Sequence, residues 1–143
     1  MNFGKIFDIQ GLNWWVIASG IGMNFVLTAA LLLTATVFIT EETNEIVSSL
    51  SISVAAFFIP FLTAYVCSRL ADERYLTYAL YPLIGFLVLA VPGIFYAGMF
   101  GLLVIGFGIL GAINGATLVA RRKIRRRREI YGPEDEGGKE EAA

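Results

Sequence analysis

The feature of this sequence that most limits its fold is the length of its uncharged stretches. Three of them, at residues 9–40, 46–68 and 75–120, contain no Asp, Glu, Lys, Arg or His. A soluble helix of this length needs charged side chains where it meets water, whereas a helix in a bilayer does not. The apolar fraction of 57% exceeds the roughly 45–50% of soluble domains. We therefore expect a single-domain, all-α integral membrane protein.

The lengths of these stretches predict the number of crossings. A helix rises about 1.5 Å per residue, so about 20 residues cross the hydrocarbon layer. The first two stretches each fit one crossing, but the third has 46 residues and has to turn back. We expect that turn at Pro92-Gly93, because proline interrupts the helical hydrogen bonds and glycine adopts turn dihedral angles. The prediction is a four-transmembrane-helix bundle with helices at residues 14–39, 46–68, 75–91 and 96–120.

Two other prolines fall inside the predicted helices. Pro82 lies in the first turns of the third helix, where its missing N–H has little effect. Pro60 lies within the second helix and is expected to kink it. The carbonyl group that Pro60 frees then needs a partner, and the nearby hydroxyls are those of Thr63 and Tyr65.

The residues outside the four helices form two further segments. Residues 1–13 are expected to be a cytoplasmic and interfacial N-terminal segment. A cleaved signal peptide is the alternative, but its apolar core would be about 7–15 residues behind a basic start. Here the core is longer and Asp8 offsets Lys5. Residues 121–143 are expected to be a basic, then acidic, cytoplasmic tail that is largely disordered after residue 132.

The basic residues predict the orientation, because Lys and Arg near helix ends remain cytoplasmic. The segment between the first two predicted helices is acidic, whereas Arg69 and Arg74 lie between the second and third. The last helix runs directly into seven basic residues. Both termini are therefore expected on the cytoplasmic side of the inner (plasma) membrane. The seven residues are Arg121, Arg122, Lys123, Arg125, Arg126, Arg127 and Arg128.

This basic cluster has two interpretations. Anionic lipid headgroups attract such cations by about 1 kcal/mol each near the surface. A docking site for nucleic acid or an acidic partner is the alternative. No aromatic residue lies among the arginines to stack on bases, since Tyr131 follows them. We expect lipid headgroups as partners and no nucleic acid.

Small residues repeat along the predicted helices at four-residue spacing. Helix association in lipid depends on close backbone approach, which small residues permit. We expect these rows to pack inside the bundle, and a homodimer face is the alternative. The predicted helix-packing residues are Gly20, Asn24, Gly108, Gly111, Ala112, Asn114, Gly115 and Ala116.

Asn24 and Asn114 are the only amide side chains deep within the predicted helices. They are expected to bond to each other and so fix the register of two helices. Such contacts average about 0.6 kcal/mol in membranes. A substrate or ion site built on these two amides is the alternative.

The predicted helices lack the groups that most catalysis requires. The chain has no histidine, one cysteine (Cys67) and no charged residue within a predicted span. Proton-coupled transport and nucleophilic catalysis depend on such groups, and so do most metal sites. We expect no enzymatic activity, no metal and no cofactor.

The last predicted helix contains LGAINGA at residues 110–116, followed by RRK at residues 121–123. This layout resembles short bacterial four-helix membrane proteins of unknown function, whose glycine-rich last helix runs into arginines. The resemblance implies an inner-membrane location and no particular activity.

Two functional hypotheses follow. The first is a structural or accessory membrane protein that packs with itself or within a larger complex. The alternative is a small channel, transporter or holin-like pore, with a polar path near Asn24 and Asn114. A weaker third hypothesis is an anchor that recruits an acidic partner through the basic cluster.

Overall fold

The computed structural model describes residues 11–38, 45–70 and 74–131, and within them the chain is all-α. Three of the described helices, α1, α2 and α5, are long and apolar enough to cross a membrane, and α4 is a shorter apolar helix. The all-α fold class is confirmed. The helices are α1 (Trp14–Phe38), α2 (Glu45–Leu70), α3 (Thr77–Leu80), α4 (Leu83–Ala97) and α5 (Met99–Tyr131).

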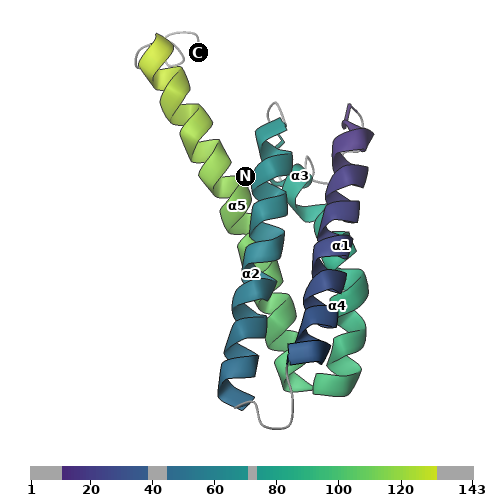
Figure 1. Ribbon diagram of the computed structural model, residues 1–143. Coiled ribbons are helices and arrows are strands. Elements are labelled where there is room, and N and C mark those ends of the chain that lie inside the picture. Colours follow the sequence, from purple (N-terminus) through teal and green to yellow (C-terminus); the bar gives the residue numbers. More distant parts are fainter. Residues whose placement is uncertain (1–10, 39–44, 71–73, 132–143) are drawn as a thin grey trace, which may run out of the picture.

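The four longer helices lie side by side and alternate in direction (Figure 1). Helix α5 packs most extensively against α2, while α1 packs against α4 and α2. As a result, α1 begins, α2 ends and α5 finishes at one end of the bundle, where α3 also lies (Figure 1). The α4–α5 turn lies at the opposite end.

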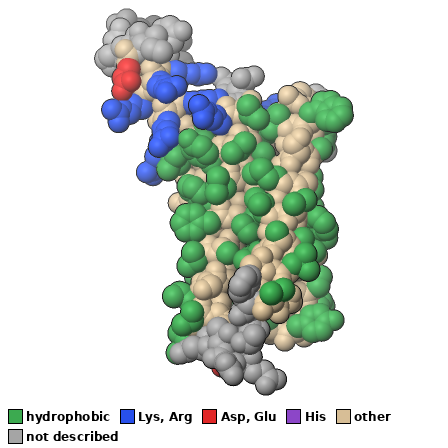
Figure 2. Space-filling view, viewed as in Figure 1, with side chains coloured by type: hydrophobic (Ala, Val, Ile, Leu, Met, Phe, Trp, Pro, Cys, Tyr) green, Lys and Arg blue, Asp and Glu red, His purple; other side chains and the backbone are tan. Residues whose placement is uncertain are grey.

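Small residues make up much of the interior, and large apolar residues cover the outside. In the most apolar 18-residue window of each long helix, only 22–33% of residues are buried. Many of the exposed side chains are large and hydrophobic, and hydrophobic side chains cover much of the visible flank of the bundle (Figure 2). Such a surface suits lipid rather than water. The main buried cluster consists of Ala56, Ala64, Ala79, Leu83, Phe86, Ala112 and Ala116.

The third predicted helix, at residues 75–91, is interrupted. Helix α3 ends at Leu80, and α4 begins at Leu83. Pro82 immediately precedes α4 and has no N–H to donate to the preceding turn, which accounts for the interruption. Both Tyr81 and Pro82 keep right-handed helical dihedral angles, so the chain continues in nearly the same direction.

The turn predicted at Pro92-Gly93 is wrong. Both residues lie inside α4, which ends at Ala97, and the chain reverses at Gly98. Gly98 has a φ of 54° and a ψ of −124°, a conformation that a residue with a Cβ rarely adopts. Its N–H donates to the carbonyl oxygen of Ile94 at 2.8 Å and closes the last turn of α4. Proline inside a membrane helix is tolerated, so it was a poorer marker of the turn than this glycine.

Helix α5 does not end where the prediction placed it, at residue 120. It continues through the basic cluster to Tyr131, and its 33 residues make it about 50 Å long. Arginine is a good helix former, and Arg125 pairs with Glu129 one turn later at 2.9 Å. The predicted disordered tail after residue 132 and most of the predicted N-terminal segment lie outside the described residues.

Helix α2 is continuous through Pro60. The carbonyl group that this proline frees is that of Ala56, four residues earlier. The Thr63 hydroxyl instead donates to Ile59 O at 3.1 Å, and the Tyr65 hydroxyl accepts from Arg122. The predicted partners of the freed carbonyl are therefore wrong: Thr63 donates its hydroxyl proton elsewhere. Tyr65 lies nine residues after Ala56, about 13 Å further along the helix, so its hydroxyl is too far away.

The position of the turn can be tested with two matched substitutions. Gly98→Ala should lower the free energy of unfolding by about 1–3 kcal/mol, because alanine is strained at this φ. Gly93→Ala should raise it by up to about 1 kcal/mol, because Gly93 is helical and its Cβ would meet open space. Denaturant unfolding in mixed micelles measures both. A turn at Pro92-Gly93 would reverse the order.

Candidate functional site

Two glycines bring the backbones of α5 and α2 together. A Cβ at Gly111 would overlap the carbonyl oxygen of Phe57, and one at Gly115 would overlap that of Phe61. Ala112 and Ala116 lie on the same side of α5 and are buried. The Gly111–Gly115 pair thus packs within the chain, which leaves it no room to form a homodimer face.

Three other glycines mark close contacts elsewhere in the bundle. A Cβ at Gly108 would strike the Phe86 ring, and one at Gly20 would lie 2.7 Å from the Cys67 sulfur. A Cβ at Gly85 would overlap the Ile21 carbonyl oxygen, so Gly85 brings α4 against α1. Sequence reasoning missed Gly85. The sequence does contain one indication of it: an isolated glycine within an apolar helix often allows a neighbouring helix to pack closely.

Asn24 links α1 to the start of α4. Its side chain is 1% exposed, and its amide nitrogen donates to the Pro82 carbonyl oxygen at 2.8 Å. The predicted bond between Asn24 and Asn114 is therefore wrong. In the described part of the chain, Asn24 Oδ1 and the buried Thr28 hydroxyl one turn later have no hydrogen-bond partner.

Asn114 lies on an exposed face of α5. Its amide nitrogen donates to the Leu110 carbonyl oxygen at 2.8 Å, within its own helix. The Thr117 hydroxyl donates to the Asn114 backbone oxygen at 3.0 Å and is also exposed. Asn114 is thus not among the residues that pack α5 within this chain. Its neighbours on this face are Leu110, Ile113 and Thr117.

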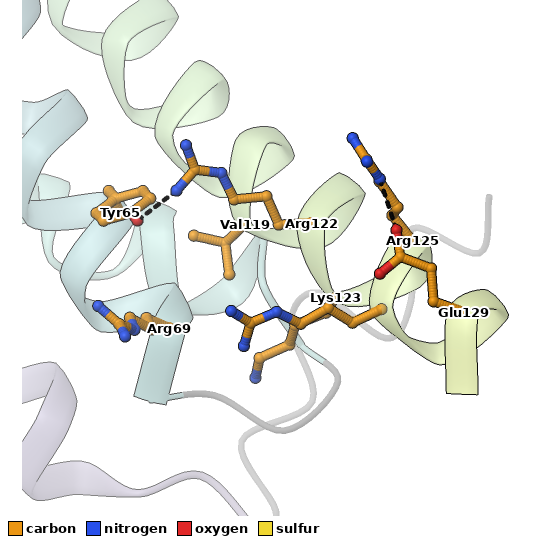
Figure 3. Close-up of a pocket in the computed structure, with 8 residues that line it drawn as sticks. Tyr65, Arg69, Val119, Arg122, Lys123, Arg125 and Glu129 are labelled. Carbon is orange, nitrogen blue, oxygen red and sulfur yellow. Dashed lines mark hydrogen bonds and ion pairs between the residues drawn. The ribbon is translucent and has the colours of Figure 1, made fainter. Parts of the chain in front are cut away.

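A basic cleft lies where α5 passes the end of α2 (Figure 3). It has a volume of about 530 Å³. Helix α2 contributes Tyr65 and Arg69, and α5 contributes the rest of the lining. The α5 residues are Val119, Arg122, Lys123, Arg125, Arg126 and Glu129.

Arg122 spans the cleft between the two helices. Its Nη1 donates to the Tyr65 hydroxyl at 3.0 Å, and its guanidinium lies 5.9 Å from the centre of the Tyr65 ring (Figure 3). Lys123 lies 5.3 Å from the centre of the Tyr75 ring. These contacts hold two of the cations against aromatic side chains.

The seven residues predicted to meet lipid headgroups divide into two groups. Arg122, Lys123, Arg125 and Arg126 line the cleft, while Arg121, Arg127 and Arg128 lie outside its lining. Sequence reasoning missed the two α2 residues, Tyr65 and Arg69. The positions of the basic residues predict Arg69 on the same side as the basic cluster, but nothing in the sequence indicates which face of α2 meets α5.

The donors in this cleft suit an anion. Guanidinium groups present planar N–H pairs that match the oxygens of a phosphate or carboxylate. The one carboxylate of the lining, Glu129, is already paired with Arg125. Among the described residues, no group of three His, Cys, Asp or Glu side chains lies close enough to hold a metal ion.

The α2–α5 contact can be tested with a matched pair of substitutions. Gly111→Leu places a large side chain against the Phe57 carbonyl and should lower the free energy of unfolding by about 1–3 kcal/mol or more. Gly106→Leu, where a Cβ meets open space, should leave it unchanged or raise it. Both variants gain the same helix propensity. Equal unfolding in mixed micelles would contradict the contact.

Comparison with known proteins gives no relative. No protein family, no curated protein and no solved structure matches this chain. The chain itself is an all-α bundle with three described helices that are long and apolar enough to cross a membrane and a shorter apolar fourth.

Proposed function

We propose that this chain is a structural or accessory protein of the inner (plasma) membrane that crosses the bilayer four times. In this proposal it has no enzymatic activity and assembles side by side with further copies of itself through the outer face of α5. A larger complex would use the same face.

The fourth crossing depends on α3 and α4 acting together. Helix α4 alone has 15 residues and would be about 22 Å long, less than the roughly 30 Å hydrocarbon layer. The interrupted helix from the start of α3 to the end of α4 covers residues 77–97 and is about 31 Å long. That length supports a full crossing.

The distribution of charge supports cytoplasmic termini. The basic side chains of α5 gather at one end of the bundle (Figure 2). Arg69, in the last turn of α2, lies at that same end, where α1 also begins. Because basic residues near helix ends remain cytoplasmic, this end is the one expected inside.

The exposed position of Asn114 carries the proposal of lateral assembly. Asn114 lies 15 residues after the start of α5, hence about 22 Å along it and within the apolar span. Its amide nitrogen donates to a carbonyl oxygen of its own helix. Lipid tails offer the rest of the amide no hydrogen-bond partner, whereas a neighbouring helix does. The same residue in a second copy is a matching partner, since an amide both donates and accepts.

The pore hypothesis requires Asn24 and Asn114 on one polar path. In this chain Asn24 is buried and bonded to Pro82, and Asn114 faces outward from α5. The geometry therefore favours assembly over a path through a single copy.

Cysteine labelling can test the four crossings. In a Cys67→Ala background, single cysteines replace Gly11, Ala97 or Arg128, and intact cells are treated with a membrane-impermeant maleimide. We expect labelling at position 97 from outside, and labelling at 11 and 128 only after permeabilisation. Opposite sides for positions 11 and 128 would contradict four crossings.

The assembly can be tested by native mass measurement after extraction in mild detergent. Asn114→Leu should weaken self-association about tenfold, which corresponds to one or two interhelical polar contacts. Asn24→Leu is the matched control: it removes the other membrane amide, so it should lower thermal stability and leave association unchanged. A wild-type chain that stays monomeric at all protein-to-detergent ratios would contradict assembly.

A further inference from the structure

The face of α5 that packs on α2 continues into the basic cluster. Gly111 and Gly115 contact α2, and Val119, Arg122 and Arg126 follow at spacings of three and four residues. Helix α2 ends at Leu70, whereas α5 continues for several turns beyond it (Figure 1). Helix α2 therefore does not accompany the continuing face, and the basic side chains of this face extend past the end of α2.

Positive charge in this cleft exceeds negative charge. Its lining has five cationic side chains and one carboxylate, and that carboxylate is paired with Arg125. Within the described part of the chain, Arg69 and Arg126 have no acidic partner. Cations that share one cleft repel each other, and a bound anion removes that repulsion.

Arg122 is fixed in the cleft by Tyr65 and still has N–H groups that can donate to such an anion. The Tyr65 hydroxyl accepts one of its N–H groups, and a guanidinium has five. Arg69 and Arg126 line the same cleft, and the remaining N–H groups of Arg122 can donate to an anion bound there. Three guanidinium groups around one cleft match the several oxygens of a phosphate better than the two of a carboxylate.

The exposed apolar surface of α2 next to the cleft favours a lipid over a soluble phosphate as the ligand. Leu62 and Val66 are exposed and lie seven and three residues before Arg69, on the same face of α2. A lipid whose acyl chain lies along these apolar residues would have its phosphate next to Arg69. Val119 marks the same level on α5, where the apolar part of the helix gives way to the basic cluster.

We propose that this cleft binds the phosphate of one anionic phospholipid, with Arg69, Arg122 and Arg126 as donors. This is a defined, one-to-one site, in contrast to diffuse attraction of the whole cluster to the membrane surface. The volume of about 530 Å³ accommodates a glycerophosphate headgroup. The site rests on the membrane embedding proposed above, but not on assembly through Asn114.

The test uses the full chain, delipidated in a neutral detergent. Phosphatidylglycerol is titrated, and its binding is followed by the shift in thermal unfolding and by native mass measurement. The variant Arg69→Gln/Arg126→Gln removes two cations from the cleft. Its matched control, Arg121→Gln/Arg128→Gln, removes two cations of α5 that lie outside the lining. All four side chains are exposed, so both variants should unfold like the wild type without lipid.

We expect one tightly bound phosphatidylglycerol per chain, and at least about tenfold weaker binding in the cleft variant. The control should weaken binding about threefold at most. Equal weakening in the two variants would overturn the site in favour of diffuse attraction. Equal stabilisation by phosphatidylcholine, or by inorganic phosphate alone, would overturn an anionic lipid as the occupant. Native mass reports bound lipid and assembly separately, so a monomer that still binds lipid would contradict only the assembly.

Discussion

The close approach of the α2 and α5 backbones organises this bundle. At Gly111 and Gly115 no side chain separates α5 from the carbonyl groups of Phe57 and Phe61. In lipid, where hiding apolar surface gives little driving force, this close packing is what holds helices together. The contact also aligns α5 along α2, so it determines which α5 residues face inward, which face outward and which pass beyond the end of α2.

A second close backbone contact joins α1 to α4, again at a glycine. Gly85 lets α4 approach the Ile21 carbonyl, and Asn24 adds a hydrogen bond to Pro82 at the interruption before α4. Gly20 lies against the same proline and against Cys67 of α2, so it connects the α1–α4 contact to α2. Close backbone approach thus occurs in two helix pairs, α2 with α5 and α1 with α4, and the second pair adds a hydrogen bond at the interruption before α4.

The sequence alone predicted the all-α class and the apolar segments, because the positions of the charged residues along the chain directly show the length of each uncharged stretch. It misplaced the turn, since proline is a weaker helix breaker in lipid and the positive φ of Gly98 depends on how α5 folds back. It also paired Asn24 with the wrong partner. All faces of these helices are apolar, so no hydrophobic stripe indicates which face points inward, and the α2 contribution of Arg69 to the cleft was equally hidden.

The helical state of the basic cluster changes what its charges can do. In a disordered tail, seven cations would act as a diffuse positive charge near the membrane. In α5 they have fixed directions: Arg122 and Arg126 turn toward α2, where Tyr65 holds the first of them, while Arg121 and Arg128 lie outside the cleft. Asn114 is exposed on α5 below this region, away from the Gly111–Gly115 contact. Because the proposed lateral assembly and the proposed phosphate site use different faces of the helix, the two proposals are compatible in one copy, and neither requires the other.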